Sequence, residues 1–225
     1  MRETDLRIRV WDGPIRVFHW GVAALVLTSW LTQHENWMRA HEFAGYTMFA
    51  ALLFRLAWGV MGSDTARFRS FLKSPVAALM HLRRFARREP DREIGHNAAG
   101  GWMVLVLLLL LAIQVGTGLC ANDQVMTYGP FAERIGQDWS DWLSHVHAVN
   151  FIAIEVAVLL HVAAVSAYML LKGQNLIRPM ITGRKRLPAG TRAPRLRGPL
   201  LALAVLAVSG GIVAVVVVVL GSGGA

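Results

Sequence analysis

The sequence is poor in cysteine and in acidic residues. Its one cysteine, Cys120, excludes a disulfide within the chain. Five long stretches are also nearly free of charge: residues 17–33, 41–62, 97–120, 147–171 and 199–220 contain only Glu42, Arg55 and Glu155. Each stretch has the roughly 20 mostly apolar residues that a helix needs to cross a bilayer. The sequence therefore excludes an ordinary soluble domain and predicts an all-α integral membrane protein with five transmembrane helices.

The chain carries a net charge of +9, and this charge is distributed unevenly between the connections. Residues 63–96 and 172–198 are strongly basic and residues 1–16 contain four arginines, whereas residues 121–146 are acidic. Basic residues in alternate connections follow the positive-inside rule. The pattern predicts a cytoplasmic N-terminus and a C-terminus on the outer side, with some attraction to anionic lipid. No nucleic-acid-binding module accompanies the charge, so we expect no nucleic-acid partner.

Eight histidines are present, and their positions separate into two groups. His34, His81 and His145 fall in or beside connections, where a solvated or interfacial imidazole is expected. The other five lie in or at the edge of an apolar stretch: His19, His41, His96, His147 and His161. An ionisable side chain within a membrane span is costly and indicates a functional site.

The stretch HAVNFIAIEVAVLLH, residues 147–161, has a histidine at each end. Fourteen helical steps turn through about 1400°, about 40° short of four full turns, and rise about 21 Å. His147 and His161 therefore share one helix face but lie too far apart for a single metal ion, whose nitrogen ligands sit about 2 Å away. The spacing predicts two separate sites, one near each membrane surface.

Each of these sites needs a second ligand at the same depth on another helix. From the predicted topology, His19 and His161 are near the inner surface, and His41 and His147 are near the outer surface. Two histidine pairs inside a four-helix bundle are typical of two six-coordinate b-type haems. Because no C-x-x-C-H motif is present, both haems would be bound without a covalent link.

The histidines have a second interpretation. They could form interhelical hydrogen bonds or a proton path, as in a proton-coupled transporter, which would contain no haem. Glu155, about 80° from the direction of His147, could take part in proton movement or hydrogen-bond across the bundle.

Three further residues are candidates for the site. Arg55 lies fourteen steps after His41 on the same face, so it is placed near the inner haem, where its guanidinium could pair with haem propionates or extend to the inner surface. His96 and Asn97 open the third span at the inner surface. They could contact a quinone headgroup, or serve as a helix cap and an interface contact.

Several motifs resemble the bacterial cytochrome b561 and nickel–iron hydrogenase b-type cytochrome family. They are VWDGPIRVFHW (10–20), HEFAGY (41–46), FRLAWGVMGSDTARF (54–68), GHNAAGGWMV (95–104) and QNLIRPMITGRKR (174–186). The resemblance implies a four-helix diheme module with His19, His41, His147 and His161 as axial ligands, and quinone reactivity near His96 and Asn97. We therefore expect a diheme domain at 1–187, a basic proline-containing cytoplasmic linker at 188–198, and an additional transmembrane helix with a short outer tail at 199–225.

The resemblance also implies a function. Family members pass electrons between a membrane quinone and an outer partner, such as a hydrogenase or a c-type cytochrome. The alternative within the family is a free-standing quinone oxidoreductase acting on a small oxidant such as superoxide. The sequence leaves a homo-oligomer and the role of the fifth helix open.

The stacked pairs predict the haem content of a variant. Wild-type protein purified in detergent should contain two b haems per chain, and His161→Ala should lose one, because it removes one ligand of the inner pair only. A pyridine haemochrome assay with reduced-minus-oxidised spectra measures both contents. Folded wild-type protein without haem would favour the proton path instead.

Overall fold

The computed structural model describes residues 6–83 and 93–220. Residues 84–92 of the predicted basic connection and the predicted outer tail, 221–225, lie outside these ranges. In the described part, five helices are long and apolar enough to cross a membrane. They are α1 (Gly13–His34), α2 (Met38–Met61), α5 (Ala98–Gly118), α7 (Gln137–Lys172) and α9 (Pro199–Ala214), which continues as a π-helix, Val215–Leu220. The predicted fold class and the five spans are confirmed.

The helix boundaries differ most from the predicted spans at α7. Helix α7 begins at Gln137, ten residues before the apolar stretch, because the polar and aromatic segment QDWSDWLSHV continues the same helix. Hydropathy detects only the part of a helix that is apolar on all sides. Four short helices were also not predicted: α3 (Phe68–Phe71), α4 (Pro75–Arg83), α6 (Ala132–Ile135) and α8 (Ile177–Thr182).

The chain forms two compact units, and the long helices contribute to both. The first comprises Met1–Val17, Leu56–Val106 and Ala157–Ala202. The second comprises Phe18–Arg55, Leu107–Val156 and Leu203–Ala225.

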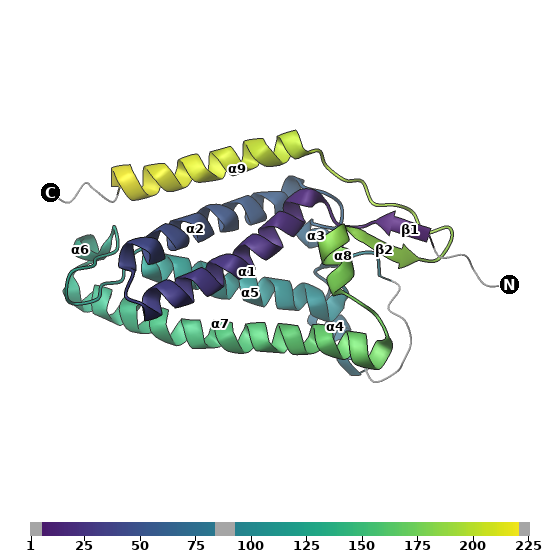
Figure 1. Ribbon diagram of the computed structural model, residues 1–225, viewed down its shortest axis with the longest axis horizontal. Helices are drawn as coiled ribbons and strands as arrows, with labels where there is room; N and C mark the ends of the chain where they lie inside the picture. Colours follow the sequence, from purple (N-terminus) through teal and green to yellow (C-terminus); the bar gives the residue numbers. More distant parts are fainter. Residues whose placement is uncertain (1–5, 84–92, 221–225) are drawn as a thin grey trace. The chain divides into compact units, whose positions relative to one another are not determined.

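A small sheet in the first unit joins segments that are far apart in the sequence. Strand β1 (Leu6–Arg9) pairs antiparallel with β2 (Arg184–Leu187), as Figure 1 shows. Arg7 faces Arg186 and Arg9 faces Arg184, and such like-charged pairs oppose strand association. Burial of Val10 and Leu187, at 0% and 2% exposure, together with the backbone ladder, favours the pairing instead.

The start of α1 is fixed by Asp12, which is buried in the first unit. One carboxylate oxygen accepts the backbone N–H of Ile15 at 2.7 Å and so caps the helix. The other accepts the indole N–H of Trp58, which is fully buried on α2, at 3.0 Å. One carboxylate therefore both begins α1 and ties it to α2.

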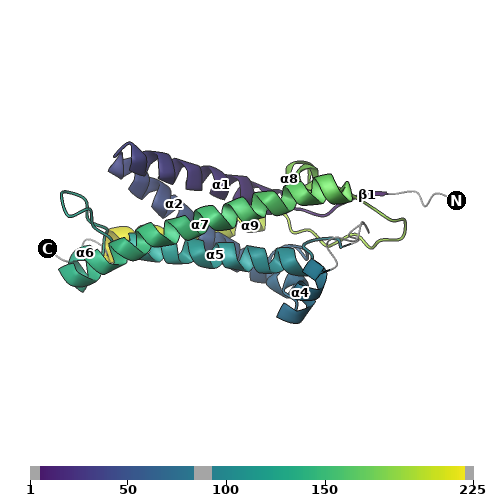
Figure 2. The ribbon, with the colours of Figure 1, turned by 90° about the horizontal axis from the view of Figure 1, so that it is seen from below.

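In the second unit, polar side chains join helices that are otherwise apolar. α5 and α7 lie side by side (Figure 2), and the buried Asn150 amide on α7 donates to the Leu110 carbonyl at 2.9 Å and to the Gln114 side chain at 2.7 Å, both on α5. The turn between α1 and α2 contains Asn36 at φ 57°, a left-handed conformation that asparagine tolerates well.

The segment between α5 and α7 folds onto the start of α7. Asn122 donates to the Ser140 hydroxyl and the Asp141 carboxylate. The next residue, Asp123, accepts hydrogen bonds from the backbone N–H groups of Thr127, Val125 and Met126. These bonds hold the pKa of Asp123 well below its usual range, so the carboxylate stays ionised in more acidic solution than an ordinary aspartate does.

Removal of the Asp12 carboxylate should destabilise the first unit. We expect Asp12→Ala to lower the free energy of unfolding by about 2–4 kcal/mol, because a helix cap is lost and the buried Trp58 N–H is left without its acceptor. Asp12→Asn keeps a capping oxygen and should lose less. Thermal unfolding in detergent measures both, and equal stability of all three proteins would contradict the assigned role.

A candidate haem site between two histidines

The second unit brings the rings of His41 and His147 together. His41 lies on the first turn of α2 and His147 on α7, and both side chains are half-buried. The ring centroids are 6.2 Å apart, with an angle of 74° between the ring planes. The structure therefore places in one site the two residues that the sequence predicts as the outer pair.

This separation fits two imidazoles bound to opposite sides of one iron. An imidazole nitrogen binds a metal ion at about 2 Å, so two such nitrogens are about 4 Å apart. With ring bonds of about 1.3 Å, each centroid lies roughly 1.1 Å beyond its nitrogen, which gives about 6 Å between centroids. In the described residues, no group of three or more His, Cys, Asp and Glu could hold a metal ion, so a macrocycle suits this pair better than a protein-only site.

Backbone carbonyls fix the orientation of both rings. Nδ1 of His41 is 2.9 Å from the carbonyl oxygen of Ser29 on α1, and Nδ1 of His147 is 2.9 Å from that of Gln114 on α5. Since a carbonyl only accepts, each Nδ1 carries the proton and donates it. The Nε2 of each ring then keeps its lone pair, which is the form that binds a metal.

Three neighbours on α5 and α7 constrain the His147 ring further. The Thr117 hydroxyl lies 3.1 Å from its Nδ1. Asn150, three residues after His147, holds α7 against α5 through the Gln114 side chain. Gly118 packs against the ring itself, because a Cβ there would lie 2.9 Å from its Cε1.

The predicted inner pair lies on two elements. His19 is on α1 in the second unit, with its ring edge-on to Trp20 at 5.0 Å, and His161 is on α7 in the first unit. Their pairing stays a prediction. Arg55 on α2 is only 2% exposed, so its guanidinium does not extend into surface water.

His96 and Asn97 precede α5 in the first unit. The His96 ring lies between the rings of Trp11 and Phe71, with centroid distances of 4.8 and 4.9 Å. The Asn97 side-chain oxygen accepts the Gly100 N–H at 2.7 Å, and its amide donates to the Tyr168 hydroxyl at 2.7 Å. Asn97 therefore caps α5, which is the second of the two roles that the sequence suggested for it.

The structure adds a contact to one expectation and corrects another. His81, which we expected to be solvated or interfacial, is half-buried and hydrogen-bonds to the Tyr168 hydroxyl at 2.7 Å. Glu155, which we expected to act within the bundle, is exposed on α7, because the buried residues Ile154 and Ala157 turn it to the outer face.

The sequence alone did not indicate Ser29, Gln114, Thr117 or Tyr168. Ser29 and Gln114 contribute backbone carbonyls to the histidines, and a carbonyl leaves no residue-specific signal. For Thr117 and Tyr168, a polar atom in an apolar stretch is the only available signal.

Residues 10–183 match the sequence pattern of a protein family described as prokaryotic cytochrome b561. The chain belongs to this family. Three relatives carry the name "Probable Ni/Fe-hydrogenase B-type cytochrome subunit". That of Azotobacter chroococcum is 24% identical over 78% of this chain and 87% of the relative. That of Bradyrhizobium diazoefficiens is 22% identical over 80% of this chain and 86% of the relative. That of Azotobacter vinelandii is 24% identical over 78% of this chain and 87% of the relative. No solved structure gave a significant match.

Family membership settles the class of the protein. The chain is a multi-pass membrane cytochrome of the b type, which binds haem b and transfers electrons. The neighbouring rings of His41 and His147 fit this cofactor in separation and tautomer.

A matched pair of glycines tests the outer site. Gly118→Ala should displace the His147 ring, whereas Gly116→Ala should have no effect, because a Cβ at Gly116 meets nothing within 4 Å. We expect Gly118→Ala to shift the midpoint potential of one haem by on the order of tens of millivolts, or to lower its content. Redox titration and the haemochrome assay measure the two effects, and equal behaviour of both variants would contradict the assigned contact.

Proposed function

We propose that the chain carries electrons across a bacterial inner membrane, between a membrane quinone and a redox partner on the periplasmic side, by means of two haem b groups. The observation that carries the proposal is the facing pair His41 and His147, with each Nδ1 hydrogen-bonded to a carbonyl. The alternating charge of the connections supports a cytoplasmic N-terminus and a periplasmic C-terminus.

Haem b supplies a reversible one-electron couple when it is bound. The chain determines how that couple is used. His41 and His147 would each supply one imidazole nitrogen to a haem iron, and a haem held by two imidazoles favours electron transfer over oxygen binding. The carbonyls of Ser29 and Gln114 fix both rings, so the chain would hold the group in a defined position.

The second haem is assigned to His19 and His161. Helix α7 runs without a break from Gln137 to Lys172 and contains both His147 and His161, which supports the predicted rise of about 21 Å between them. Burial of the Arg55 guanidinium supports a role in pairing with haem propionates, since a guanidinium matches a carboxylate with two parallel hydrogen bonds.

His96 is the residue that we assign to the quinone. Its ring is held between Trp11 and Phe71, and it also borders a cavity in the first unit. An imidazole so placed can exchange a proton with a quinone oxygen when an electron is transferred. Asn97 contributes as the cap that positions the start of α5.

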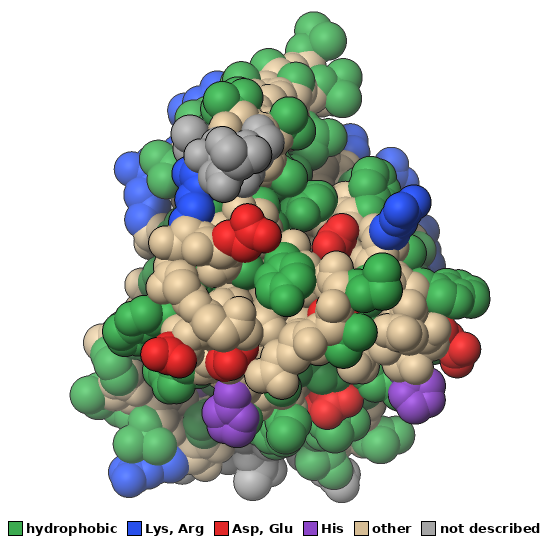
Figure 3. Space-filling view, turned by 90° about the vertical axis from the view of Figure 1, so that its left-hand side faces the viewer, with side chains coloured by type: hydrophobic (Ala, Val, Ile, Leu, Met, Phe, Trp, Pro, Cys, Tyr) green, Lys and Arg blue, Asp and Glu red, His purple; other side chains and the backbone are tan. Residues whose placement is uncertain are grey.

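The partner is assigned from the acidic outer segments. Figure 3 shows several Asp and Glu side chains spread over one face. Exposed acidic residues of the second unit include Glu35, Glu133 and Asp138. This charge suits a partner with a basic docking surface. The relatives' name, which describes a Ni/Fe-hydrogenase subunit, supports a hydrogenase as that partner, with a c-type cytochrome as the other candidate.

Quinol-driven reduction tests both the quinone and His96. In proteoliposomes, a ubiquinol or menaquinol analogue should reduce the haem of wild-type protein, as followed by the α-band. His96→Ala should slow this step at least about tenfold, because proton exchange is lost. The control His145→Ala changes an exposed histidine and should match wild type.

Dithionite separates these effects from haem loss, since it should reduce all variants equally. Wild-type haem that quinols do not reduce, and that quinones do not reoxidise after dithionite reduction, would rule out the quinone as partner. Equal quinol rates in wild type and His96→Ala would rule out the role of His96.

A further inference from the structure

A cavity of about 1160 Å³ lies in the first unit. Its walls come from three segments that are distant in the sequence: 64–71 after α2, 93–96 before α5, and 192–195 before α9. Four of the lining residues are arginines, namely Arg67, Arg69, Arg192 and Arg195. The residues that lead to the fifth helix therefore complete a basic cavity.

The carboxylates of this cavity already have partners. Asp64 lies 3.6 Å from the Arg67 guanidinium and accepts the backbone N–H of Arg195 at 3.0 Å. Glu93 pairs with Lys73 at 2.8 Å. Among the lining residues, guanidinium groups outnumber carboxylates by two, so the cavity attracts an anion.

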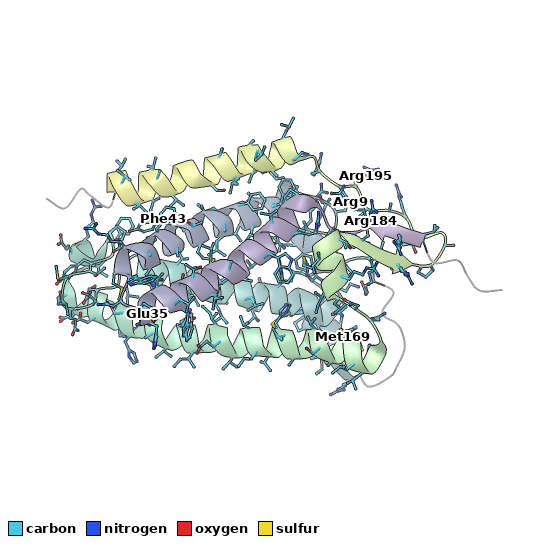
Figure 4. All side chains as sticks on the ribbon, viewed as in Figure 1. Arg9, Glu35, Phe43, Met169, Arg184 and Arg195 are labelled. Atoms are coloured by element: carbon cyan, nitrogen blue, oxygen red, sulfur yellow. The ribbon has the colours of Figure 1, made fainter. Side chains whose placement is uncertain are left out.

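Backbone hydrogen bonds hold the linker in place. The Asp64 N–H donates to the Arg195 carbonyl at 3.1 Å, and the Arg197 N–H donates to the Ser63 hydroxyl at 2.9 Å. Figure 4 labels Arg195 on this linker. Because main-chain atoms make these bonds, the linker is positioned without the side chains of Arg192 and Arg195.

The cavity adjoins the ends of apolar helices. The first lining segment begins three residues after α2 ends at Met61. The second segment ends two residues before α5, and the third ends four residues before α9 begins at Pro199. Large apolar side chains are exposed at these helix ends, including Met61 at 44% and Leu200 at 81%. The chain therefore passes within a few residues from the basic lining of the cavity to exposed apolar helix.

We infer that this cavity binds the phosphate group of an anionic phospholipid. A guanidinium matches two phosphate oxygens at once, and basic pockets beside transmembrane helices suit lipid headgroups. The exposed apolar residues favour a lipid over free phosphate, since acyl chains can cover them. His96, which we assign to the quinone, borders the same cavity. Arg192 and Arg195 lie beyond residues 10–183, the part that matches the family, and lipid binding by these two residues does not require electron transfer.

Native mass spectrometry of the full-length haem-loaded protein in detergent tests the inference. The probes are dioleoylphosphatidylglycerol, dioleoylphosphatidylcholine and inorganic phosphate. The variant is Arg192→Gln/Arg195→Gln, and its matched control is Arg178→Gln/Arg186→Gln, which removes the same charge from exposed residues outside the cavity. Haem spectra and thermal unfolding show whether each protein is folded.

Wild type and the control should retain phosphatidylglycerol in preference to phosphatidylcholine. The Arg192/Arg195 variant should bind phosphatidylglycerol about 30-fold more weakly, given about 1 kcal/mol for each basic residue near a lipid surface. Equal losses in the variant and the control would overturn the site, as would equal retention of both lipids by wild type. Retention of inorganic phosphate without preference for phosphatidylglycerol would overturn the lipid as its occupant.

Discussion

The hydrogen bonds from His41 and His147 to backbone carbonyls are the interaction on which the outer site depends. Ser29 on α1 orients His41 on α2, and Gln114 on α5 orients His147 on α7. Four helices therefore determine the relative orientation of the two imidazole rings. Backbone carbonyls in a helix cannot rotate away as side chains can, so the tautomer and direction of each imidazole are set by the packing of the second unit itself.

Polar side chains within the apolar helices follow a common principle. In a bilayer core, a polar group needs a partner from the protein, because water is absent. Asn150 and Thr117 find such partners between α5 and α7, and Asp12 finds one on α2. α9, in contrast, has no ionisable residue, and its buried Ser209 hydroxyl bonds back to the Val205 carbonyl one turn earlier. It can pack against neighbours or lipid without a specific polar contact.

Much of the fold and part of the site follow from the sequence. Apolar length gives the five spans, and helical phase with depth gives the meeting of His41 and His147. The start of α7 and the pairing of β1 with β2 do not follow, because polar helix turns and short basic strands have no hydrophobic signature. The exposure of Glu155 was missed for a related reason: phase relative to His147 alone does not reveal which face of α7 its neighbours cover.

The small sheet constrains how the chain is threaded through the membrane. Hydrogen-bonded strands lie on the same side of a bilayer, so the polypeptide between β1 and β2 crosses it an even number of times. Four candidate spans, α1, α2, α5 and α7, lie between the two strands, which is an even number. If one of the four did not cross the bilayer, the strands would lie on opposite sides. α9 comes after β2 in the sequence and is the fifth candidate span. An even number of candidate spans between β1 and β2 is thus what allows two strands so far apart in the sequence to pair.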